Sequence, residues 1–182
     1  MCYYITSTFP DQVDIEKAKK TLDRYHLQFN EILNSWILKQ IPNRRRYFRP
    51  TLKICDCGTE LGSLNGNKKK DHKSDMDKLK RKGWSQSKIN RWVKERNAYQ
   101  IKNSVKFDSY KNHNLSEGGF WYQFINDWLQ ISKEFGLLLH WYDGTIEEEN
   151  FELKKIQKIK IEDISEMFFS KMEYDTLYLF QK

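Results

Sequence analysis

The sequence lacks any long apolar run. None of its 182 residues lies in a stretch that approaches the ~18 apolar residues of a membrane-spanning helix. The N-terminal segment MCYYITSTFP has neither the basic start nor the long apolar core of a signal peptide. We therefore expect a cytoplasmic protein that works away from the membrane.

Cysteine is scarce and odd in number: Cys2, Cys55 and Cys57. In a reducing compartment they are expected to be thiols, which excludes a disulfide scaffold. Cys55 and Cys57 stand at i and i+2 of a predicted strand, so both side chains would lie on one side of it. Neither Cys2 nor the histidines complete a recognised four-ligand zinc spacing with this pair. We predict buried thiols, with no metal and no cofactor.

Sequence motifs of catalysis are also missing. There is no Gly-rich phosphate loop, no paired-carboxylate signature and no zincin motif. This absence favours a binding protein over an enzyme. One enzymatic alternative remains, because removal of Met1 would make Cys2 N-terminal, and such a cysteine can act as a nucleophile with its own α-amine as the base.

Positive charge is abundant and concentrated in one segment. Residues 39–111 carry 21 Lys and Arg against 7 Asp and Glu, a balance of +14, within a chain of net charge +7. Residues 1–38 have a balance of −1 and residues 112–182 of −6. A block of this charge attracts phosphate backbones, so the expected partner is a polyanion.

The candidate binding residues all come from this basic segment. They include an arginine run interleaved with Tyr47 and Phe48: the arginines suit bidentate phosphate contacts, and the rings either stack on bases or pack inward. The alternative is a solvated charged face. The full set is Arg44, Arg45, Arg46, Arg49, Lys68, Lys69, Lys70, Lys80, Arg81, Lys82, Lys88, Arg91, Lys94 and Arg96.

The element pattern predicts an α+β fold. Strands are expected at Cys2–Phe9, Thr51–Cys57, Leu137–Tyr142, Ile156–Ile161 and Thr176–Phe180, with His140 as a core histidine. Apolar periodicity predicts amphipathic helices over about 12–29 and 118–135, and shorter ones within 30–41 and 165–172. We expect an antiparallel or mixed sheet, backed by the two long helices, in a single domain of residues 1–182.

A basic helical insertion is predicted at about 62–116. Residues 75–82 and about 85–103 read as two helices, with Gly83 ending the first and Ser85 capping the second. Two helices joined by a tight glycine turn resemble a helix-turn-helix, so a DNA-binding regulator is a further alternative. Arg96 falls on the apolar side of the second helix, which marks it as a possible contact.

Three segments carry a family resemblance: MCYYIT at residues 1–6, CDCGTELGS at 55–63 and KGWSQSKINRW at 82–92. They resemble a family of small proteins from gut bacteria and their mobile elements that includes a type II anti-CRISPR, an inhibitor of Cas9. The resemblance implies Cas9 inhibition and assigns no individual binding residue.

The charge pattern refines what the resemblance implies. Cas9 holds nucleic acid in a positive channel, so a simple DNA mimic would be acidic, whereas this chain is basic. We expect a two-sided binder of the Cas9 effector complex. Its basic segment would contact duplex DNA or guide RNA, and its acidic C-terminal part, including Glu147–Glu149, would contact the protein.

Overall fold

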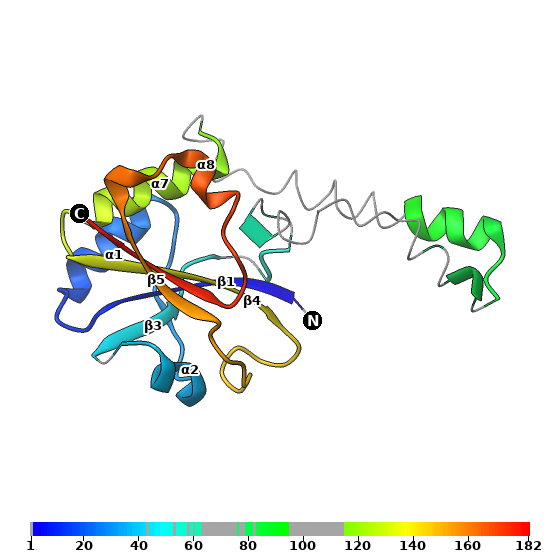
Figure 1. The fold of residues 1–182 in the computed structure, drawn as a ribbon, viewed down its shortest axis with the longest axis horizontal. Coiled ribbons are helices and arrows are strands. Elements are labelled where there is room, and N and C mark those ends of the chain that lie inside the picture. The colour runs from blue at the N-terminus through cyan, green and yellow to red at the C-terminus, as the bar shows by residue number, and fades with distance from the viewer. Residues whose placement is uncertain are drawn as a thin grey trace.

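The fold is built on a six-stranded mixed sheet with the order β2-β3-β1-β4-β6-β5 (Figure 1). It is seen in a computed structural model that describes residues 2–42, 44–52, 54–57, 59, 61–62, 76, 79–81, 83–94 and 115–182. Neighbouring strands are antiparallel except β5 and β6, which are parallel. The predicted α+β class is confirmed. The strands are β1 (Cys2–Pro10), β2 (Asn30–Glu31), β3 (Arg45–Arg49), β4 (Glu134–Tyr142), β5 (Lys155–Lys160) and β6 (Thr176–Gln181).

Strand β1 lies in the middle of the sheet but is paired unequally on its two sides. It pairs with β4 along seven residues, from Cys2 opposite Tyr142 to Thr8 opposite Gly136. A side chain at Gly136 would collide with Thr8, since a Cβ there would lie 2.4 Å from the Thr8 methyl group. On its other side β1 pairs with β3 only from Ser7 to Pro10. The first half of β1 therefore presents backbone groups that need other partners.

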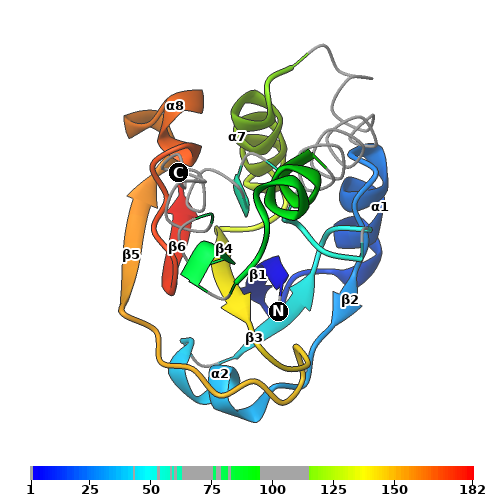
Figure 2. The same ribbon diagram turned by 90° about the vertical axis from the view of Figure 1, so that its right-hand side faces the viewer.

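The larger core lies between one sheet face and three helices, α1 (Ile15–Arg24), α7 (Glu117–Trp128) and α8 (Glu166–Phe169) (Figure 2). Large rings fill it: Phe124 lies 5.2 Å from Phe135, and Trp128 lies 5.0 Å from the same ring. The predicted backing by the two amphipathic helices is confirmed. Both are shorter than predicted, and Phe135 belongs to β4 instead of the second helix.

The opposite face of the sheet carries a smaller core under α2 (Ser35–Gln40), which includes Ile37, Tyr47 and Leu138. Asn34 begins this helix, because its side-chain oxygen accepts from the backbone N–H groups of Trp36 and Ile37. Its amide nitrogen donates to the carbonyl oxygens of residues 146 and 149. The helix is thereby joined to the loop that follows β4.

The predicted strand Thr51–Cys57 is wrong. The described residues of this segment form bends and turns, with Leu52 65% and Ile54 91% exposed. Asp56, by contrast, is fully buried. The apolar residues that suggested a strand thus face solvent, and the charged residue faces inward.

Part of the predicted basic insertion is described. Gly83 (φ +78) ends the helical residues 79–81 as predicted: its N–H donates to Lys80 O and the N–H of Trp84 donates to Leu79 O. Residues 86–94 are helical, and Ser85 caps them through the Lys88 N–H at 3.4 Å. The predictions for residues 63–75 and 95–114 lie outside the described residues, and the domain boundary stays a prediction.

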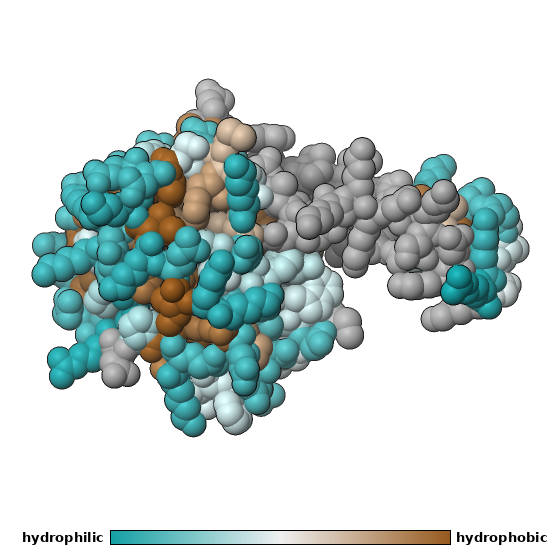
Figure 3. Space-filling model, in the orientation of Figure 1, coloured by the Kyte–Doolittle hydropathy of each residue, from teal (hydrophilic) through white to brown (hydrophobic). Residues whose placement is uncertain are grey.

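Strand β5 forms one edge of the sheet and bears lysines toward solvent. Lys155, Lys158 and Lys160 are exposed, as is Ile156, whereas Gln157 and Ile159 are half-buried. Figure 3 shows a largely hydrophilic surface on this side, with apolar groups visible among the polar ones. Lysines on an edge strand oppose pairing with another chain. Within the described part of the chain, no helix is both long and apolar enough to cross a membrane.

Candidate functional site

The two described helical pieces after residue 75 present unpaired cations. Lys80, Arg81, Lys88 and Lys94 are exposed, and none forms an ion pair with a carboxylate of the described residues. The Lys88 ammonium lies 4.2 Å from the centre of the Trp84 ring. These charges can therefore contact an external phosphate without breaking an ion pair to a described carboxylate.

The structure describes only some of the other candidate residues in this region. Arg91 is exposed on the helical residues 86–94, as is Lys94. Ile89, on the same helix, is fully buried, and Trp92 and Val93 are half-buried. The described part of the helix thus has the predicted apolar and basic sides. The candidates outside the described residues are Lys68, Lys69, Lys70, Lys82 and Arg96.

The arginine run forms β3, and internal partners engage most of it. The Arg45 side chain is 3% exposed and its Nη1 lies 2.5 Å from Glu134 Oε2. Burial lowers the pKa of Arg45, while the Glu134 carboxylate acts in the opposite direction. Arg46 pairs with Glu31 at 3.0 Å. A phosphate could reach Arg45 only by displacing Glu134 from a largely buried pair.

Arg44 and Arg49 complete the run with opposite environments. Arg49 Nη2 lies 3.9 Å from Asp56 Oδ2, and the guanidinium lies over the Tyr4 ring at 4.5 Å. Arg44 precedes the strand with φ +58 and is exposed, with no ion pair among the described residues. Of these four arginines, Arg44 is the one whose charge faces solvent without a described carboxylate partner.

The segment around Asp56 takes the place of a neighbouring strand along the first half of β1. The Asp56 N–H donates to Tyr3 O at 2.8 Å, and Asp56 Oδ2 accepts from the Ile5 N–H at 2.8 Å. The Tyr3 N–H donates to Cys57 Sγ at 3.3 Å. These three bonds satisfy the backbone groups that β3 does not reach.

This arrangement brings three thiols together. The Sγ atoms of Cys2, Cys55 and Cys57 all lie within 4.8 Å of one another, and all three residues are partly exposed. Burial raises the pKa of the Cys57 thiol to about 12, and the neighbouring Cys55 and Cys2 act in the same direction. The Cys57 thiol is thus neutral in this arrangement, which is the opposite of an activated nucleophile.

The sequence did not predict this cluster, because Cys2 does not complete a recognised zinc spacing with Cys55 and Cys57. Their proximity depends on which edge of β1 the loop occupies, and on the bonds of Asp56 that set its register. The one sequence-level indication was the combination of a cysteine at the start of a strand with a Cys-Asp-Cys triplet elsewhere.

The two ends of the predicted insertion lie close together. The Leu61 N–H donates to the Glu117 carboxylate at 3.2 Å, and the buried Glu117 is the first residue of α7. Gly62 approaches the backbone closely, since a Cβ there would lie 2.1 Å from Asp56 O. Residues 61 and 62, at the start of the predicted insertion, thus lie next to the start of α7, at the end of the insertion, and beside the loop that carries Asp56.

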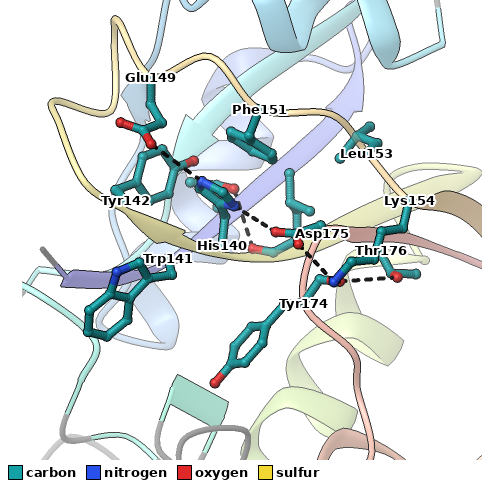
Figure 4. A network of polar contacts seen from close by, with 12 residues as sticks. His140, Trp141, Tyr142, Glu149, Phe151, Leu153, Lys154, Tyr174, Asp175 and Thr176 are labelled. Carbon is teal, nitrogen blue, oxygen red and sulfur yellow. Dashed lines mark hydrogen bonds and ion pairs between the residues drawn. The ribbon is translucent and has the colours of Figure 1, made fainter.

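A second polar network surrounds His140 on β4 (Figure 4). His140 Nδ1 lies 2.6 Å from Asp175 Oδ1, and the ring stacks on Phe151 at 3.4 Å. Asp175 also pairs with Lys154 at 2.9 Å. Because Phe151 and Lys154 belong to the segment before β5, the network holds this segment against β4. The expectation of a core histidine is confirmed, with His140 8% exposed.

The acidic cluster Glu147–Glu149 lies beside this network, and two of its side chains accept hydrogen bonds within the fold. Glu149 accepts from the backbone N–H groups of Asp143 and Gly144, at 3.3 and 2.7 Å. Glu148 accepts from the Thr145 hydroxyl. Glu147 is exposed and pairs with no cation of the described residues. Only part of the cluster is therefore available to a partner.

Comparisons with known proteins do not assign a function. No family model matches the sequence, and neither the curated proteins nor the solved structures give a match.

Proposed function

We propose that the chain is a nucleic-acid-binding protein that inhibits the Cas9 effector complex. The observation that carries the proposal is the group of exposed cations at Lys80, Arg81, Lys88 and Lys94, which form no ion pair with any carboxylate of the described residues. A cation that is not paired with a described carboxylate does not have to give up such an ion pair when it binds a phosphate. Each phosphate contact also releases condensed counterions, which favours binding.

The choice of partner rests on the resemblance of three segments to the anti-CRISPR family, together with the charge distribution. A basic segment suits the target DNA or the guide RNA, both of which are polyanions. An acidic surface suits the positively charged protein around them. The exposed carboxylates of the C-terminal part that have no cationic partner among the described residues are Asp143, Glu147, Glu148, Glu152, Asp163 and Glu166.

A cleavage assay with a matched pair of charge variants tests the proposal. Added in excess, the wild-type chain should suppress Cas9 cleavage of a target duplex. Changing Lys80, Arg81, Lys88 and Lys94 together to Glu should abolish most of this inhibition, because it removes the phosphate contacts and replaces them with repulsion.

The control variant changes the same net charge elsewhere. Lys17, Lys20, Lys133 and Lys158 are exposed and form no ion pair with the described residues. Their change to Glu should retain inhibition. Equal loss in both variants would show that total charge matters instead of this site, and full inhibition by the first variant would contradict the proposal.

The other two hypotheses predict different results. A helix-turn-helix regulator would prefer one DNA sequence over others of equal length and would leave Cas9 unaffected. A thiol-dependent enzyme would lose its activity when Cys2 is changed to Ala, whereas a binding protein would keep its affinity for nucleic acid.

A further inference from the structure

The three-thiol cluster joins two parts of the chain that are far apart in sequence. Cys2 stands at the start of β1, and Cys55 and Cys57 lie on the loop that hydrogen-bonds along that strand. The loop is held there by Asp56, whose Oδ2 accepts from the Ile5 N–H and from the Thr51 hydroxyl. The position of the thiols is therefore fixed by the fold and not by a chance approach of loose side chains.

The separation of the sulfur atoms is close to that of a tetrahedral thiolate site. With metal–sulfur bonds of about 2.3 Å, two sulfurs at the tetrahedral angle lie about 3.8 Å apart. The three Sγ atoms lie within 4.8 Å of one another, so small side-chain rotations would bring all three to bonding distance. The partial exposure of all three residues leaves a path for an ion.

The surroundings of Cys57 already contain a feature of metal–thiolate sites. The backbone N–H of Tyr3 donates to Cys57 Sγ at 3.3 Å. Such a donor orients a ligating sulfur and stabilises its negative charge. Three thiols also cannot all be satisfied by one disulfide, since any bridge leaves the third sulfur unpaired.

We propose that Cys2, Cys55 and Cys57 bind one soft metal ion, Zn²⁺, through three thiolates. Soft sulfur ligands favour zinc over the hard cations magnesium and calcium. Each thiol gives its proton to solvent as its sulfur bonds the metal, so three protons are released for each ion bound. The fourth position is filled by water.

The bound ion would fix the start of β1 to the loop that ends at residue 62, where the predicted basic insertion begins. Its role would be to hold the base of the insertion beside Glu117 at the start of α7. This inference goes beyond nucleic-acid binding and does not depend on it.

Cobalt titration tests the site directly. The untagged full chain, stripped of metal and kept reduced, is titrated with Co²⁺ and then with Zn²⁺. We expect one equivalent of Co²⁺ to give a thiolate-to-cobalt charge-transfer band and the strong visible bands of tetrahedral coordination. Zn²⁺ should remove both. The thermal midpoint should rise with added Zn²⁺, because the ion binds the folded chain in preference to the unfolded one.

Single substitutions locate the ligands. Cys2→Ser, Cys55→Ser and Cys57→Ser should each lose stoichiometric binding. His26→Asn is the matched control: it removes an exposed imidazole while asparagine tolerates the backbone at φ +52, and its titration should equal that of the wild type. If Cys57→Ser does not fold, Cys2→Ser carries the test, because circular dichroism will show whether it keeps the native sheet.

Three results would overturn the proposal. The reduced wild-type chain could bind no Co²⁺, or the bands could persist in folded Cys2→Ser and Cys55→Ser. Mass spectrometry of chain purified without reductant could also show a disulfide between two of the three cysteines, while the reduced chain takes up no metal. That last result would assign the cluster a redox role instead.

Discussion

At the residue scale, two arginines that are neighbours in sequence differ in their exposure to solvent. Arg44 is exposed, whereas Arg45 is almost fully buried against Glu134. The sequence predicted both as phosphate ligands because it shows charge but not partners, and Glu134 lies 89 residues further along the chain. Which arginine forms a buried ion pair is decided only by the pairing of β3, β1 and β4 in the sheet.

Tyr47 shows the same dependence on distant partners and gives a pH prediction. Of the two roles expected for its ring, stacking on bases or packing inward, the structure shows the second: Tyr47 is buried, its hydroxyl donates to Thr6 Oγ1, and that hydroxyl lies 2.9 Å from the Tyr142 hydroxyl. Burial raises the pKa of Tyr47 to about 12, against about 10 in an unfolded chain. The unfolded state therefore loses this proton first as pH rises.

The free energy of unfolding should accordingly be intact below about pH 10 and fall between about pH 10 and 12. Two pKa units correspond to about 3 kcal/mol for this group. Urea unfolding across that range measures it. Tyr47→Phe should cost about 1 kcal/mol at neutral pH and make the alkaline decline shallower. An unchanged decline would mean that Tyr47 ionises as easily folded as unfolded.

At the element scale, strands were predicted well where apolar residues continue over several positions. β1 and β6 begin at the predicted residue. β5 begins one residue earlier than predicted, and β4 begins three residues earlier, at Glu134. The segment 51–57 was misread because Leu52 and Ile54 suggest a buried strand. Asp56 instead joins this segment to β1 through hydrogen bonds, and the local sequence pattern does not predict such long-range bonds.

The role of Asp56 as a substitute for a strand partner predicts a large effect of a small change. Asp56→Asn keeps the size of the side chain but removes the charge that accepts from Ile5 N–H and Thr51 and faces Arg49. We expect a loss of about 2–3 kcal/mol in the free energy of unfolding. Faster hydrogen exchange at the Ile5 amide should accompany it.

The matched control is Asp163→Asn, which makes the same chemical change at an exposed aspartate without a described cationic partner. Its effect should stay within about 0.5 kcal/mol. Equal effects of the two substitutions in urea unfolding, or an unchanged exchange rate at Ile5, would show that the loop does not brace β1.

At the scale of the whole molecule, the fold class and the two backing helices followed from the sequence, but the site did so only in part. The cations of residues 80–94 were found from charge and helical period, which are local properties. The three-thiol cluster was not, because it forms only when the loop and β1 meet. The molecule thus has an internally neutralised arginine strand, together with exposed cations on the helical residues after it.

The most direct test of the proposed function is the salt dependence of duplex DNA binding. The logarithm of the binding constant should fall linearly with the logarithm of salt concentration, with a slope of about −0.9 for each phosphate neutralised. The Glu variant of Lys80, Arg81, Lys88 and Lys94 should bind far more weakly, while the control variant of Lys17, Lys20, Lys133 and Lys158 should largely keep the wild-type slope. Binding that is independent of salt, or equal in the two variants, would contradict the account.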